Sequence, residues 1–466
     1  MIYVPLGGAI DEIGASCHYV KVDGTGLLLD AGADPEKEGR DSLPDFGRIH
    51  ARSDWHVDHI VLSHAHHDHI GSLPIAIKEF PHAHVHMTQP TRSLLDVLLP
   101  ASARLQRRRV QEGTMTEDPL FSEEDIEVSS YLYLTHPYET DFDLTGMNGA
   151  SPVTGRLIDA GHVLGSAGVL ITAEDNGETR RIFYTGDTGA SSQTIIPGAE
   201  YPDGPVDVLL LEATLGMDAE AENFPRRGEE KRLGEALRTV LSRGGCVLIP
   251  AFSLGRSQEM LALIDRYKKR KLIPSDTPVY TAGMMRAISD VYDKTRFVSP
   301  RLDEEFMVFG VEQKRLPRGN NELNKLLSEP GIFVVGSGMM FERTISNKIA
   351  QQLVSHEKNG IFMVGFARVD SPAERLLDAA AAGPGTEVIL DRLKGPQELK
   401  CMVDKFRFSG HSNRRDLLDL VEHLEPEHII LLHGEQPARQ WMANNIAYFH
   451  PDIQVHMPER GETVEV

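Results

Sequence analysis

The sequence predicts an α/β protein in which a helix-rich segment interrupts a core of short strands. Three observations lead to this prediction. Short apolar strands joined by tight turns fill the first 75 residues, and strand–turn–strand texture returns at 153–190. From about residue 225 strands and helices alternate, which is typical of a parallel sheet covered by helices. After about residue 395 a strand–loop–helix pattern with histidines returns.

Composition describes an ordinary globular chain with an acidic surface. The 466 residues correspond to about three domains. Of these residues 41% are hydrophobic and 25% are charged, as expected of a folded protein with an ample core. The net charge of −21 argues against non-specific nucleic-acid binding. It does not exclude a nucleic-acid substrate, because bound divalent ions would reverse the sign locally.

Cysteine usage and the first residues indicate the compartment. Cys17, Cys246 and Cys401 are far apart and form no C-x-x-C motif, so we expect no disulfide framework. Residues 1–8 contain no basic segment and no long apolar stretch, so we expect no signal peptide. No apolar run approaches the length of a membrane span. The sequence therefore predicts a cytoplasmic protein without a membrane segment.

The first part of the chain predicts a hairpin and then a long helix. Tyr19–Val22, a turn at Asp23-Gly24 and Gly26–Asp30 read as two antiparallel strands. Residues 91–112 read as a helix with a dense basic patch. The patch consists of Arg104, Arg107, Arg108 and Arg109. It is interpreted either as a solvated helix face or as a phosphate contact.

The run Ser63–His69 is the most informative motif, because it places metal-ligating side chains in the pattern H-x-H-x-D-H. Its candidate ligands are His64, His66, Asp68 and His69. Imidazole suits zinc, and an interspersed carboxylate suits a second ion beside the first. Residues 60–62 read as a buried strand, so the ligands leave a strand end into a loop. A structural zinc site would normally use cysteine, so the pattern favours a catalytic metal site.

A second group of histidines alternates along the chain. His82, His84 and His86 have the periodicity of a strand and so share one face. A separate metal site is one interpretation. The other is a polar face over the neighbouring histidine loop, which we prefer.

The middle of the chain reads as strands and helices in alternation. The predicted strands are 182–185, 206–211, 246–250, 279–281, 331–335 and 360–364, and the predicted helices are 229–242 and 257–269. Single candidate ligands follow three strands or turns, namely His162, Asp187 and His433. Each alone is more often structural. Together with the first cluster they complete two metal sites.

Taken in order, these motifs resemble the β-CASP group of metallo-β-lactamase-fold hydrolases. This group of nucleases includes ribonuclease J, Artemis and the endonuclease subunit of the pre-mRNA cleavage and polyadenylation machinery. The matching positions are His64, His66, Asp68 and His69 (second motif), His162 (third), Asp187 (fourth), Glu212 (motif A), His411 (motif B) and His433 (motif C). Pro250–Glu259 also resembles the cap of this group.

The resemblance implies a fold and a domain order. Residues 1–215 and 396–466 would form a metallo-β-lactamase αββα sandwich. Residues 216–395 would form an inserted α/β β-CASP cap. The switch to alternating strands and helices at about residue 225, and the return of the strand–loop–helix pattern with histidines at about residue 395, agree with this order.

The resemblance also implies two Zn²⁺ ions per chain, although Mn²⁺ can occupy mixed His/Asp sites. One ion would be held by His64, His66 and His162, the other by Asp68, His69 and His433, with Asp187 bridging the two. The implied reaction is phosphodiester cleavage by a metal-activated hydroxide. Asp68 would orient the hydroxide. His411 would act as general acid, and Glu212 would hold its ring and raise its pKa.

The implied substrate is single-stranded RNA lying in a groove between core and cap, because a duplex would have to open to enter. Internal cleavage is expected, with 5′ exonuclease activity as a further option, in RNA processing or decay. Candidate phosphate contacts are Arg256, Ser337 and Arg343. We expect no RNA-binding domain such as a KH domain before the core, so specificity is expected from the cap, a partner or a homodimer.

The match departs from the family at several positions. His67 stands where an apolar or small residue is common, and Phe341 and Glu342 stand where glycines are usual. Three alternatives stay open. They are a DNA nuclease of the Artemis type, a small-molecule hydrolase such as a thioesterase or lactonase on the same core, and a catalytically inactive scaffold.

Overall fold

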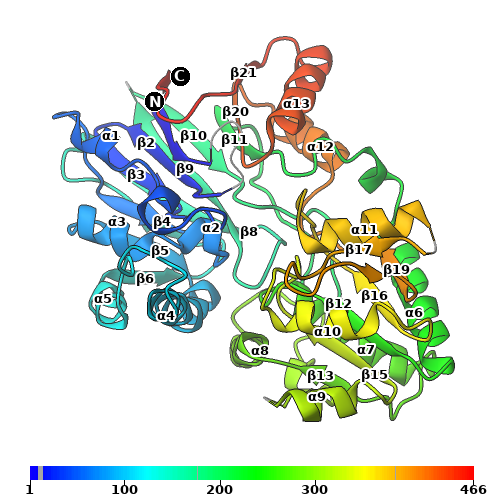
Figure 1. The fold of residues 1–466 in the computed structure, drawn as a ribbon. Helices are drawn as coiled ribbons and strands as arrows, with labels where there is room; N and C mark the ends of the chain where they lie inside the picture. Colours follow the sequence, from blue (N-terminus) through cyan, green and yellow to red (C-terminus); the bar gives the residue numbers. More distant parts are fainter. Residues whose placement is uncertain (9–13, 176, 318, 384) are drawn as a thin grey trace.

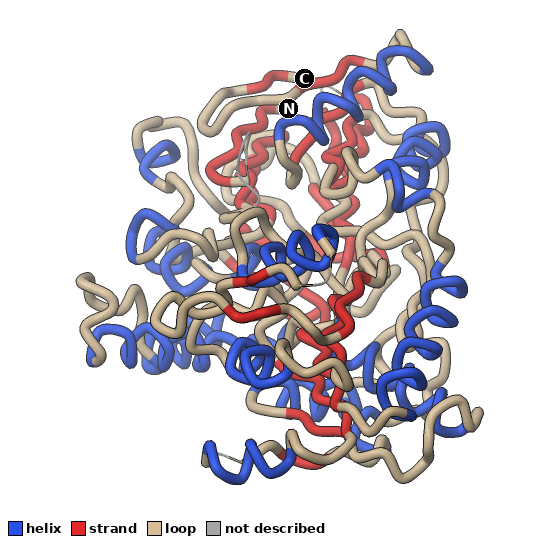
Figure 2. The backbone as a smooth tube through the Cα atoms, turned by 45° about the vertical axis from the view of Figure 1, so that its right-hand side comes forward, coloured by secondary structure: helices blue, strands red, loops and turns tan. Residues whose placement is uncertain are grey.

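The structure is a computed structural model, and it describes residues 1–8, 14–175, 177–317, 319–383 and 385–466. Figure 1 shows two parts, a core with its sheets at the upper left and a cap at the lower right. The two termini lie side by side, because the last strand pairs with the first. Figure 2 shows strands along the middle of the molecule and helices around them.

Two sheets of seven strands each make up the core in the described part of the chain. The first has the order β22-β1-β2-β3-β4-β5-β6, and the second β21-β20-β11-β10-β9-β8-β7. In the first sheet the strands are β1 (Ile2–Gly7), β2 (Cys17–Val22), β3 (Thr25–Leu29), β4 (His59–Val61), β5 (His84–Thr88), β6 (Tyr133–His136) and β22 (Val464–Glu465). In the second they are β7 (Asp141–Asp143), β8 (Val153–Asp159), β9 (Ala167–Asp175), β10 (Glu178–Tyr184), β11 (Val208–Glu212), β20 (His428–Leu432) and β21 (Gln454–His456).

Alternating side chains explain why these sheets stack. Leu27 and Leu29 of β3 face inward and pack with strands of the second sheet, whereas Leu28 faces the helices outside. Buried helix residues such as Leu420 and Met442 cover the outer face of the second sheet. The core helices are α1 (Gly47–His50), α2 (His67–Ile70), α3 (Leu73–Glu79), α4 (Gln89–Gln111), α5 (Glu123–Ser129), α12 (Arg414–Leu424) and α13 (Gln436–Phe449), with short 3₁₀ turns η1 (Gly39–Ser42) and η2 (Ser130–Leu132). The layers are therefore αββα.

The cap is built on a third sheet, with the order β14-β13-β15-β12-β16-β19 and every pairing parallel. Its strands are β12 (Cys246–Pro250), β13 (Val279–Thr281), β14 (Lys314–Arg315), β15 (Gly331–Val335), β16 (Gly360–Met363) and β19 (Met402–Lys405), beside a hairpin of β17 (Glu387–Val388) and β18 (Gln397–Glu398). Its helices are α6 (Arg226–Ser242), α7 (Arg256–Lys269), α8 (Met284–Lys294), α9 (Asn320–Leu326), α10 (Ile345–Leu353) and α11 (Pro372–Ala382), with η3 (Ala219–Glu222) and η4 (Val308–Gly310).

Helices cover both faces of the cap sheet, as a parallel sheet requires. Val247 of β12 packs with Leu237 and Leu261 of α6 and α7, whereas Leu248 packs with Ile349 of α10. Strand β19 belongs to this sheet although it lies beyond residue 395, the predicted end of the cap. It pairs parallel with β16, in a register that places Met402 opposite Gly360.

A buried carboxylate ties cap to core. Glu259 of α7 is fully buried and accepts hydrogen bonds from the backbone N–H groups of Thr194 and Ile195 in the core. The same carboxylate accepts a hydrogen bond from Arg226 at 3.1 Å. Three donors thus satisfy one buried charge, which fixes the two parts against each other.

Most of the predicted elements are present. The hairpin of 19–22 and 26–30 is confirmed as β2 and β3, which pair antiparallel. The helix of 91–112 is confirmed as α4, and its arginines form ion pairs with Glu38, Glu112 and Glu123, as a solvated helix face does.

The alternating histidines of 82–87 lie differently from the prediction. His84 is exposed, whereas His86 is buried beside the histidines of two neighbouring strands. His86 lies 3.0 Å from His59 and 2.9 Å from His136, measured between ring nitrogens. Strands β4, β5 and β6 bring these three rings together, and Phe142 stacks on the rings of His86 and His136. The prediction that this histidine face covers the Ser63–His69 loop is therefore wrong for His86.

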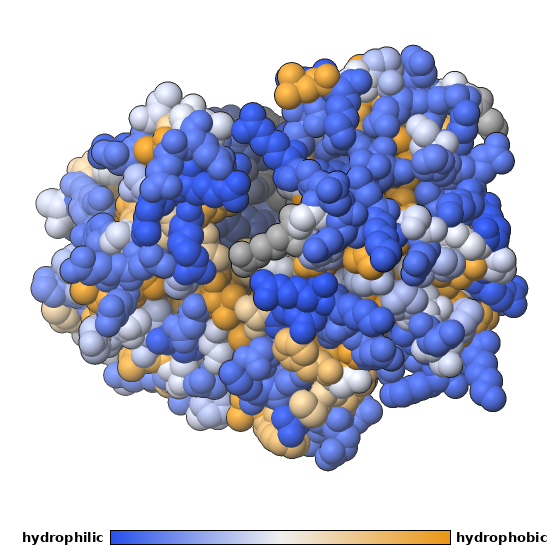
Figure 3. Space-filling view, turned by 60° about the horizontal axis from the view of Figure 1, so that its bottom comes forward, coloured by the Kyte–Doolittle hydropathy of each residue, from blue (hydrophilic) through white to orange (hydrophobic). Residues whose placement is uncertain are grey.

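The surface is largely polar on the face that looks toward the viewer in Figure 3. Figure 3 shows a face that is mainly hydrophilic, with scattered hydrophobic side chains and a hollow near its middle. None of the helices in the described ranges is long and apolar enough to cross a membrane.

The buried histidine chain predicts acid sensitivity. Burial and the imidazoles of His59, His136 and His84 together lower the pKa of His86 to about 3, against the opposing charge of Asp143. Below pH ~6.5 the unfolded chain therefore binds a proton that the folded chain does not, so stability falls as the pH falls from ~6.5 toward 3. At pH ~5.5 this one group costs about 1.4 kcal/mol.

His86→Leu should remove this contribution, which thermal unfolding between pH 7.5 and 5.5 would measure. We expect a smaller drop in Tm over this range than in the wild-type protein. His82→Leu, an exposed histidine just before the same strand that does not act on His86, is the control and should keep the wild-type drop. Equal pH dependence in all three proteins would contradict the prediction.

Candidate metal centre

The ligand candidates converge at one end of the sandwich, where several strands end. Loop and helix residues after β4 supply the first four, and the β8–β9 loop supplies His162. Asp187 follows β10, and His433 follows β20. Among the residues that the structure describes, three groups of side chains come close enough to hold a metal ion, with their ligand atoms within 4.8 Å of one another. These groups are His64, His66, His162 and Asp187; Asp68, His69 and His433; and Asp187, Glu212 and His411.

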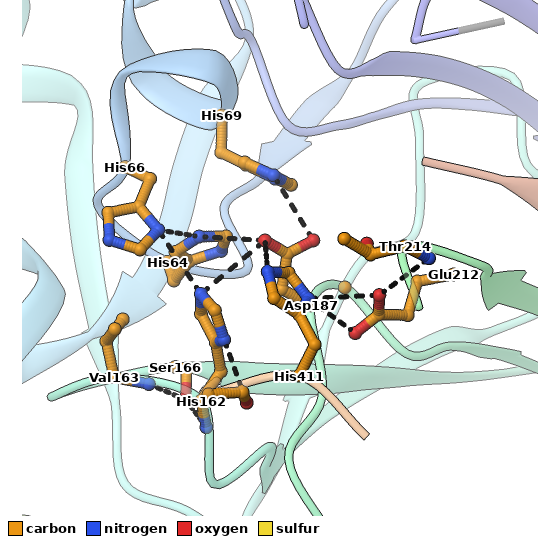
Figure 4. Close-up of polar contacts among 12 residues, drawn as sticks. His64, His66, His69, His162, Val163, Ser166, Asp187, Glu212, Thr214 and His411 are labelled. Carbon is orange, nitrogen blue, oxygen red and sulfur yellow. Dashed lines mark hydrogen bonds and ion pairs between the residues drawn. The ribbon is translucent and has the colours of Figure 1, made fainter. Parts of the chain in front are cut away.

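The first group joins three imidazoles to one carboxylate oxygen (Figure 4). His66 Nδ1 lies 3.0 Å from His64 Nε2 and 3.2 Å from His162 Nε2. Asp187 Oδ2 lies 3.5 Å from the same nitrogens of His64 and His162. Four donor atoms thus face one another in a small buried space.

The second group is arranged in the same way around the other oxygen of Asp187. His69 Nε2 lies 3.3 Å from His433 Nε2, and the latter lies 3.5 Å from Asp68 Oδ2. Asp187 Oδ1 lies 3.4 Å from His69 Nε2 and 3.1 Å from His433 Nδ1. One carboxylate therefore presents one oxygen to each group of ligands.

These distances fit zinc. A tetrahedral zinc ion with bonds of about 2.0–2.1 Å has neighbouring donors about 3.3 Å apart, close to the spacing of both groups. Asp187 Oδ1 is buried without a hydrogen-bond partner among the described residues. A cation would satisfy that atom.

Protonation states in the site also suit a cation. Burial and the charge of His69 lower the pKa of His64 well below its ordinary value, so its nitrogen stays free to bind metal. Burial raises the pKa of Asp187, but His433, His69 and His411 outweigh burial and hold that pKa well below its usual range. Neutral imidazole and ionised carboxylate are the forms that bind a metal ion.

Asp30 holds ligand side chains in place through hydrogen bonds, and the sequence alone did not predict this role. It is fully buried at the end of β3 and accepts four hydrogen bonds at 2.7 Å, from His69 Nδ1, the Ser63 backbone and hydroxyl, and the Tyr184 hydroxyl. The bond to Nδ1 leaves Nε2 of His69 free to face the site. The sequence feature that could have indicated this role is an acidic residue directly after an apolar strand.

Other ligands are oriented by similar contacts. Ser63 Oγ lies 3.0 Å from Nδ1 of His64. The carbonyl of Gly410 accepts a hydrogen bond from Nδ1 of His162 at 3.1 Å. Thr214 Oγ1 lies 3.0 Å from Nδ1 of His433. Each contact fixes a ring whose remaining nitrogen or edge faces the site.

His411 lies beside the ligands, on the side away from the histidine loop (Figure 4). Its Nδ1 lies 3.0 Å from both oxygens of Glu212, and its Nε2 lies 4.0 Å from Asp187 Oδ2. Glu212 is fully buried and also accepts a hydrogen bond from the Thr188 N–H at 2.7 Å. Burial lowers the pKa of His411, but Glu212 and Asp187 outweigh burial and raise it to about 9. The ring is therefore a proton donor aimed at the ligand groups.

The candidate phosphate contacts are not members of these groups, although the Arg256 guanidinium lies beside Gly410, the residue before His411. Arg256 is buried at the cap–core junction, with its guanidinium 3.4 Å from Gln193 Oε1. Ser337 and Arg343 lie on the loop after β15, where Arg343 is exposed and the Ser337 hydroxyl is buried without a partner among the described residues. His67, which departs from the resembled motif, is exposed.

Comparison with known families assigns most of the chain. Residues 10–215 match the metallo-β-lactamase superfamily, and residues 257–376 match the β-CASP domain. Residues 396–458 match the Zn-dependent metallo-hydrolase RNA specificity domain. The last of these contains His411 and His433.

Named relatives align along nearly the whole chain. The endoribonuclease YSH1 of Candida glabrata is 28% identical over 485 aligned residues, which cover 100% of this chain and 59% of that protein. YSH1 of Kluyveromyces lactis is 29% identical and covers 93% of this chain and 55% of that protein. The cleavage and polyadenylation specificity factor subunit 3 of Dictyostelium discoideum is 28% identical, covering 99% and 56%. The chain thus spans less than two thirds of these relatives.

A solved structure shares the fold. It is a protein of unknown function from Enterococcus faecalis V583, with a TM-score of 0.55 and 15% identity over the full length of both chains. At this identity the likeness concerns the fold alone.

The Asp30 contacts predict a test of metal binding. Asp30→Asn replaces the acceptor of the His69 Nδ1–H by an amide of the same shape. We expect zinc affinity to fall about 10–100-fold, as for other outer partners of metal-bound histidine. Zinc retention against a competing chelator would measure this. Tyr184→Phe removes one bond to Asp30 and leaves that to His69, so it should change affinity far less. Equal zinc affinity in both variants would contradict this role of Asp30.

Proposed function

Because the chain belongs to the β-CASP group of the metallo-β-lactamase superfamily and matches a Zn-dependent metallo-hydrolase RNA specificity domain, we propose that it is a two-zinc phosphodiesterase that cuts single-stranded RNA internally. The observation that carries the proposal is the position of Asp187. Its two oxygens face two separate groups of ligands, 3.5 Å from His64 and 3.4 Å from His69. Two ions sharing one carboxylate require this arrangement.

The proposed ligand sets follow the two groups. His64, His66 and His162 would hold one zinc ion, and Asp68, His69 and His433 the other, with Asp187 shared. Bound zinc supplies Lewis-acid stabilisation of phosphate charge and lowers the pKa of bound water toward about 7. Asp68 is the more exposed carboxylate of the site, with 23% of its side chain accessible. It would accept a hydrogen bond from the attacking water and so orient it.

His411 would serve the leaving group. Its Nδ1–H is engaged by Glu212, so Nε2 carries the proton that can be given away. In the proposed reaction the phosphorus–O3′ bond breaks, and Nε2 donates its proton to the departing oxygen. The products would be a 3′-hydroxyl and a 5′-phosphate. Glu212 acts as a positioning residue, because it touches His411 alone among the reacting groups.

RNA as substrate is supported by the domain that contributes His411 and His433. Residues 396–458 match an RNA specificity domain, and the YSH1 relatives are named endoribonucleases. The acidic net charge of −21 fits a protein that binds nucleic acid at a defined site and not over its surface.

His411→Ala tests the proposal. The variant should keep its zinc, because His411 is absent from both proposed ligand sets, while cleavage falls about 10²–10⁴-fold with the loss of the proton donor. The measurement is cleavage of 5′-labelled single-stranded RNA beside DNA of the same sequence, with zinc quantified on the same preparations. The ladder of products distinguishes internal from terminal attack.

His423→Ala, an exposed histidine on α12, is the matched control and should cleave at the wild-type rate. Full cleavage by His411→Ala would refute the proton-donor role. Cleavage of DNA alone would reassign the substrate. Two bound ions without cleavage of either polymer would favour a small-molecule substrate.

Asp187→Ala tests the shared ligand. Removing one carboxylate from both groups should lower bound zinc from about two ions per chain to at most one, and cleavage should fall with it. Elemental analysis after dialysis against a weak chelator measures the loss. A variant that retained two ions would show that Asp187 is not shared.

A further inference from the structure

The cap sheet presents one edge to the metal centre. All its paired strands are parallel, so their carboxyl ends lie together. The chain leaves the carboxyl end of β19 at Lys405 and reaches His411 within the next loop, which places this edge beside the site. The loops after β12, β15 and β16 emerge at the same edge.

Within this edge, strands β12 and β16 are a natural place for a ligand. They are neighbours in the sheet (Figure 1), yet the chain continues from β12 toward β13 on one side and from β16 toward β19 on the other. Open α/β sheets bind their ligands outside the carboxyl ends of the strands, at the point where successive connections diverge in this way.

Three phenylalanines are exposed on the loops around this point. Phe252 follows β12, Phe341 follows β15 and Phe366 follows β16, with exposed fractions of 37%, 42% and 51%. The ring of Phe252 lies between the other two loops. A Cβ on Gly338, in the loop after β15, would lie 3.3 Å from this ring, and a Cβ on Gly365, in the loop after β16, would lie 3.5 Å from it. Apolar rings left in water on three separate loops of one edge indicate a binding surface.

Cationic side chains accompany the rings. The guanidinium of Arg368 lies 5.8 Å from the centroid of Phe341 and pairs with Glu36 of the core. Arg368 therefore reaches from the cap loop to the core, which puts the rings at the entrance between the two parts. Arg343 is exposed and has no ion pair among the described residues. In a chain of net charge −21 these arginines offer a local match for phosphate.

We propose that Phe252, Phe341 and Phe366 form a base-stacking subsite for single-stranded RNA, with Arg343 and Arg368 contacting its phosphates. This inference rests on the proposed function and adds how the strand is recognised. A phenylalanine ring has no hydrogen-bonding group, so it accepts any base and selects only for an open base face. Paired bases in a duplex offer no such face, so the subsite selects unpaired RNA regardless of sequence.

The test uses His411→Ala, which is expected to bind RNA without cutting it. The probe is a 12-nucleotide oligouridylate with one internal 2-aminopurine, whose fluorescence is quenched on stacking. We expect the fluorescence to be quenched when the protein binds the probe. The double variant Phe341→Leu/Phe366→Leu, made in the His411→Ala background, should bind about 10–100-fold more weakly and quench less, since stacking contributes about 1–3 kcal/mol per base. An oligonucleotide with abasic sites in place of three adjacent bases keeps every phosphate and should lose affinity to a similar degree.

Phe297→Leu is the matched control, because Phe297 is an exposed cap phenylalanine that follows the end of α8 instead of a sheet strand. It should bind like the parent. Tm and zinc content are compared for every variant. If the wild-type protein cuts RNA but the double variant and the abasic strand bind as well as their parents, the stacking subsite is refuted and the proposed function stands. If RNA is neither cut by the wild type nor bound by His411→Ala, both are refuted.

Discussion

The carboxylate of Asp187 is the interaction on which the site depends. It is buried, and an isolated buried anion is costly unless opposite charge or hydrogen bonds surround it. Four histidines from three separate segments supply those contacts, at 3.1–3.5 Å for the nearest nitrogens. The strands that end beside it must therefore stop at the same edge of the sandwich. Asp30, which holds the ring of His69, is a second buried carboxylate, and four donors satisfy it in the same way.

This constraint extends into the cap through His411. The loop that carries His411 leaves β19, the edge strand of the cap sheet, and its Gly410 carbonyl holds the ring of His162. A shift of the cap would thus move a proton donor and a ligand together. Glu259 opposes such a shift, because its buried charge is satisfied only while the core backbone at Thr194 and Ile195 stays in place. Cap and core consequently act as one unit at the site.

Sequence reasoning recovered what is local in the chain. The ligands of the Ser63–His69 run stand within seven residues, and strand periodicity located most strands of the parallel cap sheet. It missed contacts that depend on pairing between distant strands. Asp30 meets His69 only because β3 and β4 pair, and His86 meets His136 only because β5 and β6 pair. Spacing along a chain carries no information on such register, and a single Asp after an apolar strand is common.

Under the proposed function, recognition and chemistry would fall on different parts of the molecule. A centre made of imidazoles and carboxylates interacts with a phosphodiester, and that group is common to paired and unpaired strands. Selection of an unpaired strand therefore has to come from groups that contact bases. The exposed rings on the loops after β12, β15 and β16 can do so, while the carboxyl edge that carries them also leads to His411. A strand held by its bases there would present its backbone to the ligands of the core, so one sheet edge would set both which strand enters and where it is cut.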